Sequence, residues 1–261
     1  MTPKKIRILI SNDDGIYAPG IYALYKELKK IGDVFVVAPD NEKSAVGHAI
    51  TLSSPLRVFP FKRNGKFFGY AVNGTPADCV KIAHWALLKD QPVDLLVSGI
   101  NHGSNTGINV IYSGTASAAT EGTILRIPSF AISVATYDPV DFTVAARFAR
   151  RLARLLLKKG LPPETFLNVN VPPVSESEIT GVEITRQGKA VFAEEFDRRV
   201  DPTGRTYYWL TGKKVHLERE GGDTDDQVIL QNKISITPIH YDMTNYNFLD
   251  ELQNWNISVV S

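Results

Sequence analysis

The sequence contains one cysteine, almost no net charge and no long apolar run. Cys79 alone excludes an intramolecular disulfide and a cysteine-rich zinc site, and such cysteine usage is typical of a reducing compartment, so we expect a cytoplasmic protein. Lys and Arg number 29 against 28 for Asp and Glu, which leaves a net charge of +1. We therefore expect no binding to a nucleic-acid polymer. No segment approaches the roughly 18 apolar residues that cross a bilayer, so we expect no membrane partner.

Short β-branched apolar runs alternate with helical patterns along the first part of the chain. The runs do not alternate with polar residues, which is typical of strands covered on both faces; they are residues 6–11, 34–38, 93–98 and 129–134. The helical patterns lie at about 19–31, 76–89, 114–125 and 141–159. This order predicts an α/β protein with a doubly wound parallel sheet.

Two further segments depart from that alternation. Residues 56–72 contain two apolar stretches separated by Asn64-Gly65, a dipeptide that strongly favours a hairpin turn. Beyond residue 175 the chain becomes extended, polar and aromatic. We expect a catalytic core at 1–175 and a β-rich extension at 176–261 that belongs to the same domain and is completed by packing on the core or on a second subunit.

Three polar loops follow predicted strands: residues 11–15, 39–48 and 98–109. In an open parallel sheet the loops at the carboxyl ends of the strands meet at one edge, where ligands bind. Asp13 and Asp14 stand side by side in the first loop and repel each other unless a cation lies between them. The same Asp-Gly sequence is also ordinary turn chemistry, and this alternative stays open.

The oxygen-bearing side chains of these loops suit a hard divalent cation. Carboxylates together with Ser44, Asn101 and Asn105 favour Mg²⁺ or Mn²⁺ over zinc, because the five histidines show no paired ligand spacing. Residues 112–119 open a helix with hydroxyls and small side chains, an arrangement that can hold a phosphate through free backbone N–H groups. Ordinary capping and close packing of the helix on the sheet explain the same residues equally well.

Four segments together resemble the SurE family, the survival-protein 5′-nucleotidases. They are NDDGIYAPGI (12–21), KSAVGHAITL (43–52), NGTPADCV (73–80) and SGINHGSNTG with YSGTASAATEG (98–122). They occur in the family's order and cover the N-terminal half of the chain. Ala45 stands where many members have glycine. Beyond about residue 175 the resemblance rests mainly on ISITPI (234–239).

The resemblance implies a Rossmann-like, three-layer core and a metal-dependent phosphomonoesterase that acts on nucleoside monophosphates. It implies one divalent ion per subunit, Mg²⁺ or Mn²⁺, held by Asp13, Asp14, Ser44 and Asn101. It places on the phosphate side Asn105 and the helix start Ser113, Gly114 and Thr115. It also implies a homodimer or homotetramer formed through an exchanged C-terminal extension.

The mechanism that we favour is attack by a metal-activated water, with one of the two catalytic aspartates, Asp14 in preference to Asp13, accepting the proton. His102 or a metal-bound water then protonates the leaving oxygen, unless His102 only bonds to backbone. An aspartyl-phosphate phosphatase is an alternative, although such enzymes place two aspartates at i and i+2 rather than i and i+1. A non-catalytic nucleotide sensor is a second alternative. A dinucleotide-dependent oxidoreductase is weaker, because no G-x-G-x-x-G follows the first strand.

Overall fold

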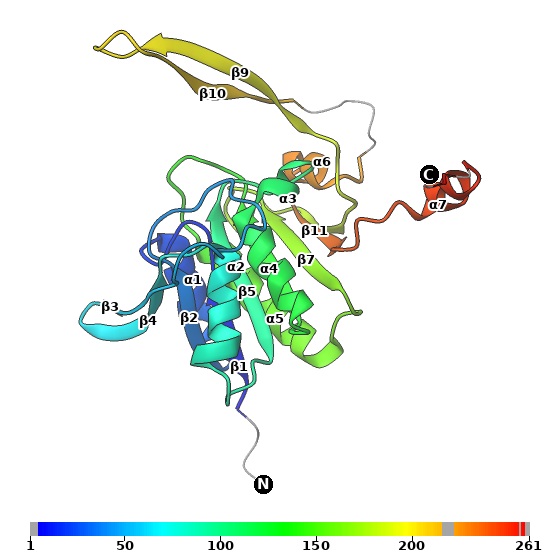
Figure 1. The fold of residues 1–261 in the computed structure, drawn as a ribbon. Coiled ribbons are helices and arrows are strands. Elements are labelled where there is room, and N and C mark those ends of the chain that lie inside the picture. Colours follow the sequence, from blue (N-terminus) through cyan, green and yellow to red (C-terminus); the bar gives the residue numbers. More distant parts are fainter. Residues whose placement is uncertain (1–4, 216–221, 256, 259–261) are drawn as a thin grey trace.

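A computed structural model describes residues 5–215, 222–255 and 257–258, and it contains one large sheet (Figure 1). Its nine strands lie in the order β3-β4-β2-β1-β5-β6-β7-β11-β8. The strands are β1 (Arg7–Ser11), β2 (Asp33–Pro39), β3 (Val58–Arg63), β4 (Lys66–Val72), β5 (Leu95–His102), β6 (Ser129–Val134), β7 (Thr165–Val171), β8 (Gly181–Ile184) and β11 (Lys233–His240). The six consecutive strands from β4 to β7 run parallel, as the sequence predicts.

Helices cover both faces of this sheet and make a three-layer α/β structure. On one face α1 (Pro19–Leu28) packs against α5 (Thr143–Lys159), and on the other α2 (Pro76–Ile82) packs against α4 (Gly114–Ile124). Leu24 and Leu152 belong to one apolar core and Cys79 to the other. Every residue of β6 is buried, because a central parallel strand is covered from both sides. The Rossmann-like core is therefore confirmed.

Two predicted elements differ in detail. Asn64 and Gly65 have φ angles of 51° and 75°, the left-handed pair that a tight hairpin turn requires, and β3 and β4 flank them. However, β4 also pairs in parallel with β2, so the hairpin extends the main sheet. The helix expected at 76–89 widens after Ile82 into a π-helical turn, η1 (Ala83–Leu87). The wider turn brings the side chain of Leu88 into the core beneath it.

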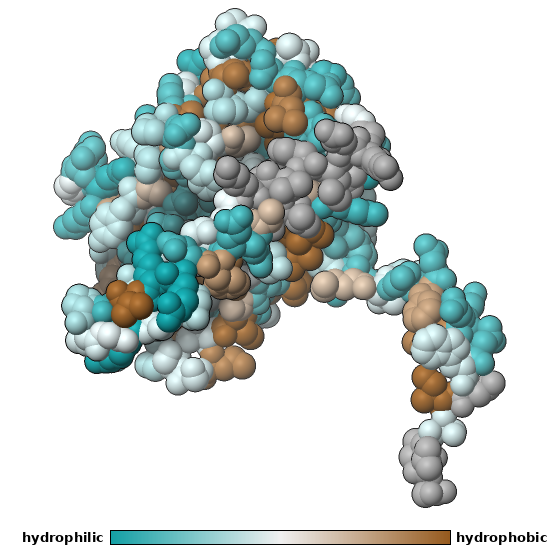
Figure 2. All heavy atoms as spheres, turned by 90° about the horizontal axis from the view of Figure 1, so that it is seen from above, coloured by the Kyte–Doolittle hydropathy of each residue, from teal (hydrophilic) through white to brown (hydrophobic). Residues whose placement is uncertain are grey.

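The chain beyond residue 175 partly completes the sheet and partly leaves the body. Strand β11 pairs antiparallel with β7, and β8 pairs with β11 at the sheet edge. Strands β9 (Val191–Val200) and β10 (Thr206–Val215) pair only with each other and form a long hairpin that projects beyond the body (Figure 1). The remaining helices are α3 (Asn109–Tyr112), α6 (Asp225–Leu230) and α7 (Tyr246–Gln253). Helix α7 stands away from the body in both Figures 1 and 2.

No helix among the described residues is both long enough and apolar enough to span a bilayer.

Candidate active site

The loops after β1, β2 and β5 meet at the carboxyl edge of the sheet. The backbone N–H of Lys43 donates to the carbonyl of Asp13 at 2.7 Å, which joins the second loop to the first. The backbone N–H of His102 donates to Oδ2 of Asp14 at 3.2 Å, which joins the third loop to the first. Two short backbone contacts thus bring the residues next to Ser44 and Asn101 against the acidic pair.

Asp13 is buried and lies against the start of α4. The hydroxyl of Thr115 donates to its Oδ1, and the backbone N–H of Thr115 bonds the same carboxylate. A Cβ on Gly114 would lie 2.7 Å from Cβ of Asp13 and 3.0 Å from its Oδ2. Only glycine allows that approach. Burial raises the pKa of Asp13, although these bonds lower it in part.

Asp14 is less buried, and its charge is poorly compensated. Burial, and then the charge of Asp13, raise the pKa of Asp14 to about 7, while its bond from His102 acts in the other direction. Glu42 adds a third negative charge that acts on both aspartates. Sequence analysis missed Glu42, because nothing local distinguishes it from an ordinary surface glutamate.

Ser44, on the loop after β2, and Asn101, near the end of β5, border this pair. Ser44 is exposed and its hydroxyl donates to Oε1 of Glu42. Asn101 is half-buried, and its Nδ2 donates to the carbonyl of Gly103 at 2.7 Å, which orients the side chain. Ala45 has a φ of 54°, a left-handed conformation that explains why glycine is common at this position in the family.

The third loop places its two candidate residues differently. His102 is tied by Nε2 to the carbonyl of Asp138 at 2.7 Å, and because a carbonyl only accepts, Nε2 carries the hydrogen. Asn105 is buried, and its Nδ2 donates to Oγ of Ser133 at 3.0 Å. The backbone of Asn105 is bonded to the side chain of Asn170, through contacts of 2.8 and 3.0 Å.

The start of α4 already uses several of its polar groups. The hydroxyl of Ser113 accepts the backbone N–H of Ala116 at 2.9 Å, so Ser113 is a true N-cap. Thr115 serves Asp13, as described above. The structure thus shows both the capping by Ser113 and the close packing at Thr115. Gly114 lies between these two residues and faces Asp13.

Two buried carboxylates that sequence analysis did not single out hold the second loop. Asp78, at the start of α2, accepts the backbone N–H of Thr51 at 3.0 Å and its hydroxyl at 2.6 Å. Glu121, on α4, lies 2.9 Å from Nε2 of His48 and 2.7 Å from Nζ of Lys81. Burial alone would raise the pKa of Glu121, but these two partners outweigh it and hold that pKa below its usual value. These contacts therefore anchor the end of the second loop at residue 48 and the segment just after it at residue 51.

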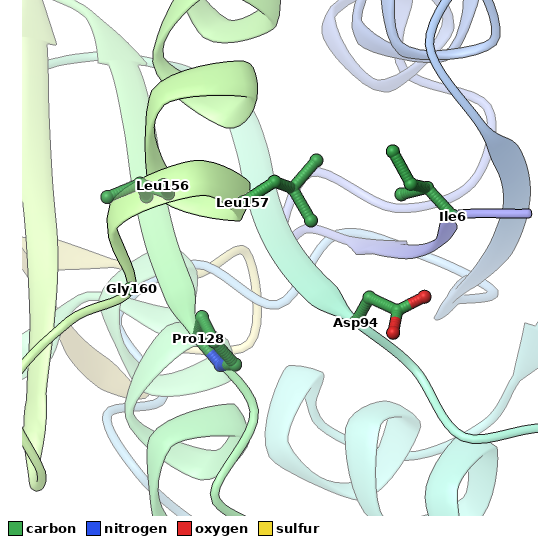
Figure 3. A pocket seen from close by; sticks show the side chains of 6 residues that line it. All are labelled: Ile6, Asp94, Pro128, Leu156, Leu157 and Gly160. Carbon is green, nitrogen blue, oxygen red and sulfur yellow. The ribbon is translucent and has the colours of Figure 1, made fainter. Parts of the chain in front are cut away.

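Two pockets formed by the described residues lie away from this site. The first, about 300 Å³, is lined by residues that precede β1, β5 and β6, including Ile6, Asp94 and Pro128 (Figure 3). Asp94 accepts the backbone N–H of Arg7 at 2.9 Å and so has a structural part. The second, about 560 Å³, borders the starts of β6 and β7. Both are at the amino edge of the sheet, whereas the acidic pair is at the carboxyl edge, where ligands bind in such folds.

The acidic pair fits a divalent cation. Two adjacent carboxylates with raised pKa values, one buried and one half-buried, are costly as they stand, and a cation offsets that cost. Oδ1 of Asn12, beside the pair, is buried without a hydrogen-bond partner among the described residues. The described residues hold no group of three His, Cys, Asp or Glu side chains suited to a metal. The four predicted ligands do not make such a group, because only two of them are carboxylates and the other two are a serine and an asparagine.

Comparison with known proteins agrees with this geometry. The sequence pattern of the family described as Survival protein SurE matches residues 8–194. The chain belongs to the SurE family. A protein named 5′-nucleotidase SurE from Syntrophobacter fumaroxidans (strain DSM 10017 / MPOB) is 52% identical over 252 residues, covering 97% of this chain and 100% of that protein. One of the same name from Syntrophus aciditrophicus (strain SB) is 56% identical over 248 residues, covering 95% and 93%.

A solved SurE structure shows that the similarity extends to the fold. The crystal structure of the SurE protein from Aquifex aeolicus superposes with a TM-score of 0.83 at 38% sequence identity, covering 96% of this chain and 100% of that chain. The resemblance inferred from four N-terminal segments therefore holds over nearly the whole chain, including the part beyond residue 175.

Proposed function

We propose that this chain is a 5′-nucleotidase, a metal-dependent phosphomonoesterase that converts nucleoside monophosphates to nucleoside and inorganic phosphate. The observation that carries the proposal is the pair at the carboxyl edge of the sheet, buried Asp13 and half-buried Asp14, which lacks enough donors to balance two charges. The relatives named 5′-nucleotidase SurE, about half identical over nearly the full chain, support the reaction class.

The residues that would hold the cation are Asp13, Asp14, Ser44 and Asn101. Their hard oxygen atoms suit Mg²⁺ or Mn²⁺, one ion per subunit. Such an ion would supply neutralisation of the phosphate charge and a more acidic water. Because the hydroxyl and the backbone N–H of Thr115 both bond Asp13, they fix the orientation of that carboxylate.

The other site residues bind the phosphate and move protons. We assign the backbone N–H of Gly114 and the side chain of Asn105 to phosphate oxygens, since positive charge at a helix start stabilises an anion. Asp14 accepts the proton of the attacking water. The leaving oxygen receives its proton from solvent at the site or from His102. Because the carbonyl of Asp138 engages Nε2–H, His102 donates through Nδ1 only as an imidazolium, since Nδ1 of the neutral ring carries no hydrogen.

The test is release of inorganic phosphate from a panel of nucleoside monophosphates. We expect turnover with Mg²⁺ or Mn²⁺, none in EDTA, and none for Asp13→Asn, while Asp90→Asn at an exposed position of the same charge retains full rates. Tight nucleotide binding without phosphate release would identify a sensor instead. Phosphate trapped on Asp13 in a single turnover would identify the aspartyl-phosphate route.

We also propose that the chain forms a homodimer or homotetramer through its C-terminal extension. The projecting β9–β10 hairpin exposes large side chains, among them Phe196, Tyr208, Trp209 and Leu210, each more than half exposed. Hydrophobic atoms also gather on α7, apart from the body (Figure 2). An isolated two-stranded hairpin is marginally stable in water, and exposed apolar surface of this kind marks contact sites. Light scattering of the intact chain measures the subunit number.

A cytoplasmic location is a further part of this proposal. It is supported by Cys79, which is the chain's one cysteine and is buried with a free thiol.

A further inference from the structure

The loop between β5 and α3 is held close to its end, at Gly107 and Ile108, by three hydrogen bonds. The backbone N–H of Gly107 donates to Oδ2 of Asp225 at 2.9 Å. The carbonyl of Gly107 accepts Nε2 of Gln187 at 2.7 Å, and the next backbone N–H, of Ile108, donates to the carbonyl of Ala190 at 3.3 Å. This loop also carries Asn105, two residues earlier.

These partners come from both ends of the projecting hairpin. Residues 186–190 lead directly into β9, and α6, which begins with Asp225, follows β10 along the chain. The two ends are joined to each other: Oδ1 of Asp225 accepts the backbone N–H of Gly188 at 3.0 Å, and the backbone N–H of Asp225 donates to the carbonyl of Arg186 at 3.0 Å. One carboxylate therefore contacts the site loop and both ends of the hairpin.

Asp225 is fully buried, and none of the roles assigned above uses it. Its two oxygens accept three backbone N–H groups, from Gly107, Gly188 and Asp226. A carboxylate can accept on both sides, whereas an amide can accept on only one. Because donors approach both oxygens of residue 225, this position requires a carboxylate rather than an amide of the same size.

We propose that Asp225 is a positioning residue, whose buried carboxylate fastens the Asn105–Gly107 turn of the phosphate side to the two ends of the β9–β10 hairpin. The inference rests on the proposed function for its effect on turnover. It adds that the geometry of the phosphate side depends on how the hairpin is seated. Side chains 80 and 118 positions away in sequence bond the two backbone groups of one residue, Gly107.

The variant that tests this is Asp225→Asn. Its remaining oxygen can still accept from Gly188 and Asp226, while its NH₂ group faces the N–H of Gly107 and the bond to the loop is lost. We expect backbone hydrogen exchange in peptides covering 103–109 to speed up about tenfold, as for one lost hydrogen bond to a charged acceptor. We expect KM for a nucleoside monophosphate to rise about tenfold with kcat changed less than threefold, because a looser loop weakens ground-state and transition-state binding alike.

Asp226→Asn is the matched control. It removes the same charge from the neighbouring buried position of α6, and we expect exchange of 103–109 and KM to stay as in wild type. Gln187→Ala, at an exposed position, removes the bond on the other side of Gly107 and carries the test if Asp225→Asn fails to fold. In the double variant the two effects should be less than additive, since both bonds hold the same residue, Gly107.

Unchanged exchange of 103–109 in both Asp225→Asn and Gln187→Ala would overturn the proposal, and so would an equal effect of Asp226→Asn. Exchange is measured without substrate or metal. A wild-type chain that releases no phosphate would therefore refute the proposed function and leave the positioning role of Asp225 to be decided by exchange alone.

Discussion

Asp14→Asn should stabilise the metal-free protein and abolish its response to metal. Burial and the charge of Asp13 raise the pKa of Asp14 from 3.8 to about 7. At about 1.36 kcal/mol per pKa unit, the roughly three-unit shift corresponds to about 4 kcal/mol of stability lost once Asp14 is ionised in the folded state. Water reaches this half-buried side chain and screens part of that cost, so we expect a gain of about 2 kcal/mol in the variant.

The sign of the pH dependence follows from the raised pKa. Because the folded state holds its proton more tightly than the unfolded one, the contribution of Asp14 to stability is fully present below pH 3.8 and is lost as the pH rises through about 7. Asparagine carries no charge at any pH. The advantage of Asp14→Asn should therefore be largest at about pH 8 and small at about pH 4.

Thermal unfolding in EDTA measures this effect. A gain of about 2 kcal/mol corresponds to about 4–8 °C in Tm for a chain of this size. Mg²⁺ or Mn²⁺ should raise the Tm of the wild type, because a ligand that binds the folded state stabilises it, and should leave that of Asp14→Asn unchanged. The exposed Asp90→Asn serves as the control. The reasoning fails if Asp14→Asn lowers the Tm at about pH 8, or if its advantage is the same at about pH 4.

Three further substitutions test the surroundings of the pair. Gly114→Ala should cut phosphate release at least tenfold, about 1.4 kcal/mol in the barrier, because the added Cβ displaces Asp13; normal rates would contradict this. Thr115→Val should weaken metal affinity about tenfold in a titration, whereas Thr123→Val, which loses a bond to a helix carbonyl, should not. Glu121→Gln should lower the free energy of unfolding by about 1–3 kcal/mol in urea at neutral pH. Because the pKa of Glu121 is lowered from 4.5 in the folded state, the stability advantage of the wild type is present above pH 4.5 and should be lost as the pH falls below that value.

Most of the core could be predicted because its signals are local. Mainly apolar runs without polar alternation, such as 129–134, identify central parallel strands, and the positive φ angles at Asn64 and Gly65 are what that dipeptide favours. The meeting of three polar loops at one edge also follows, since it depends only on the strands being parallel. The π-helical turn after Ile82 could not be predicted, because it depends on how Leu88 fits beneath the helix.

The residues that hold the site were harder to find, because their partners are distant in sequence. Asp225 bonds Gly107, and Glu121 bonds His48, across 118 and 73 positions. Asp225 lies in no pattern that distinguishes it from an ordinary helix residue, and Glu121 lies within a segment that carries the family resemblance but has no local feature that assigns it a partner. Asn168 and Asn170 offered a weak signal, since both are asparagines within the largely apolar run of β7, and their bonds to Asn105 explain them.

The buried acids of this chain differ in how their charge is balanced, and that difference separates scaffold from site. Asp78 accepts three hydrogen bonds from Thr51 and Thr75, which outweigh burial and hold its pKa below the usual value. Asp14 accepts one backbone N–H and faces a like charge, so burial prevails and its pKa rises to about 7. Packing alone does not require Asp78 to receive three donors while Asp14 receives one donor and a second acid as its neighbour. The negative charge left unbalanced at Asp14 is best explained by a bound cation, which would in turn attract an anionic substrate.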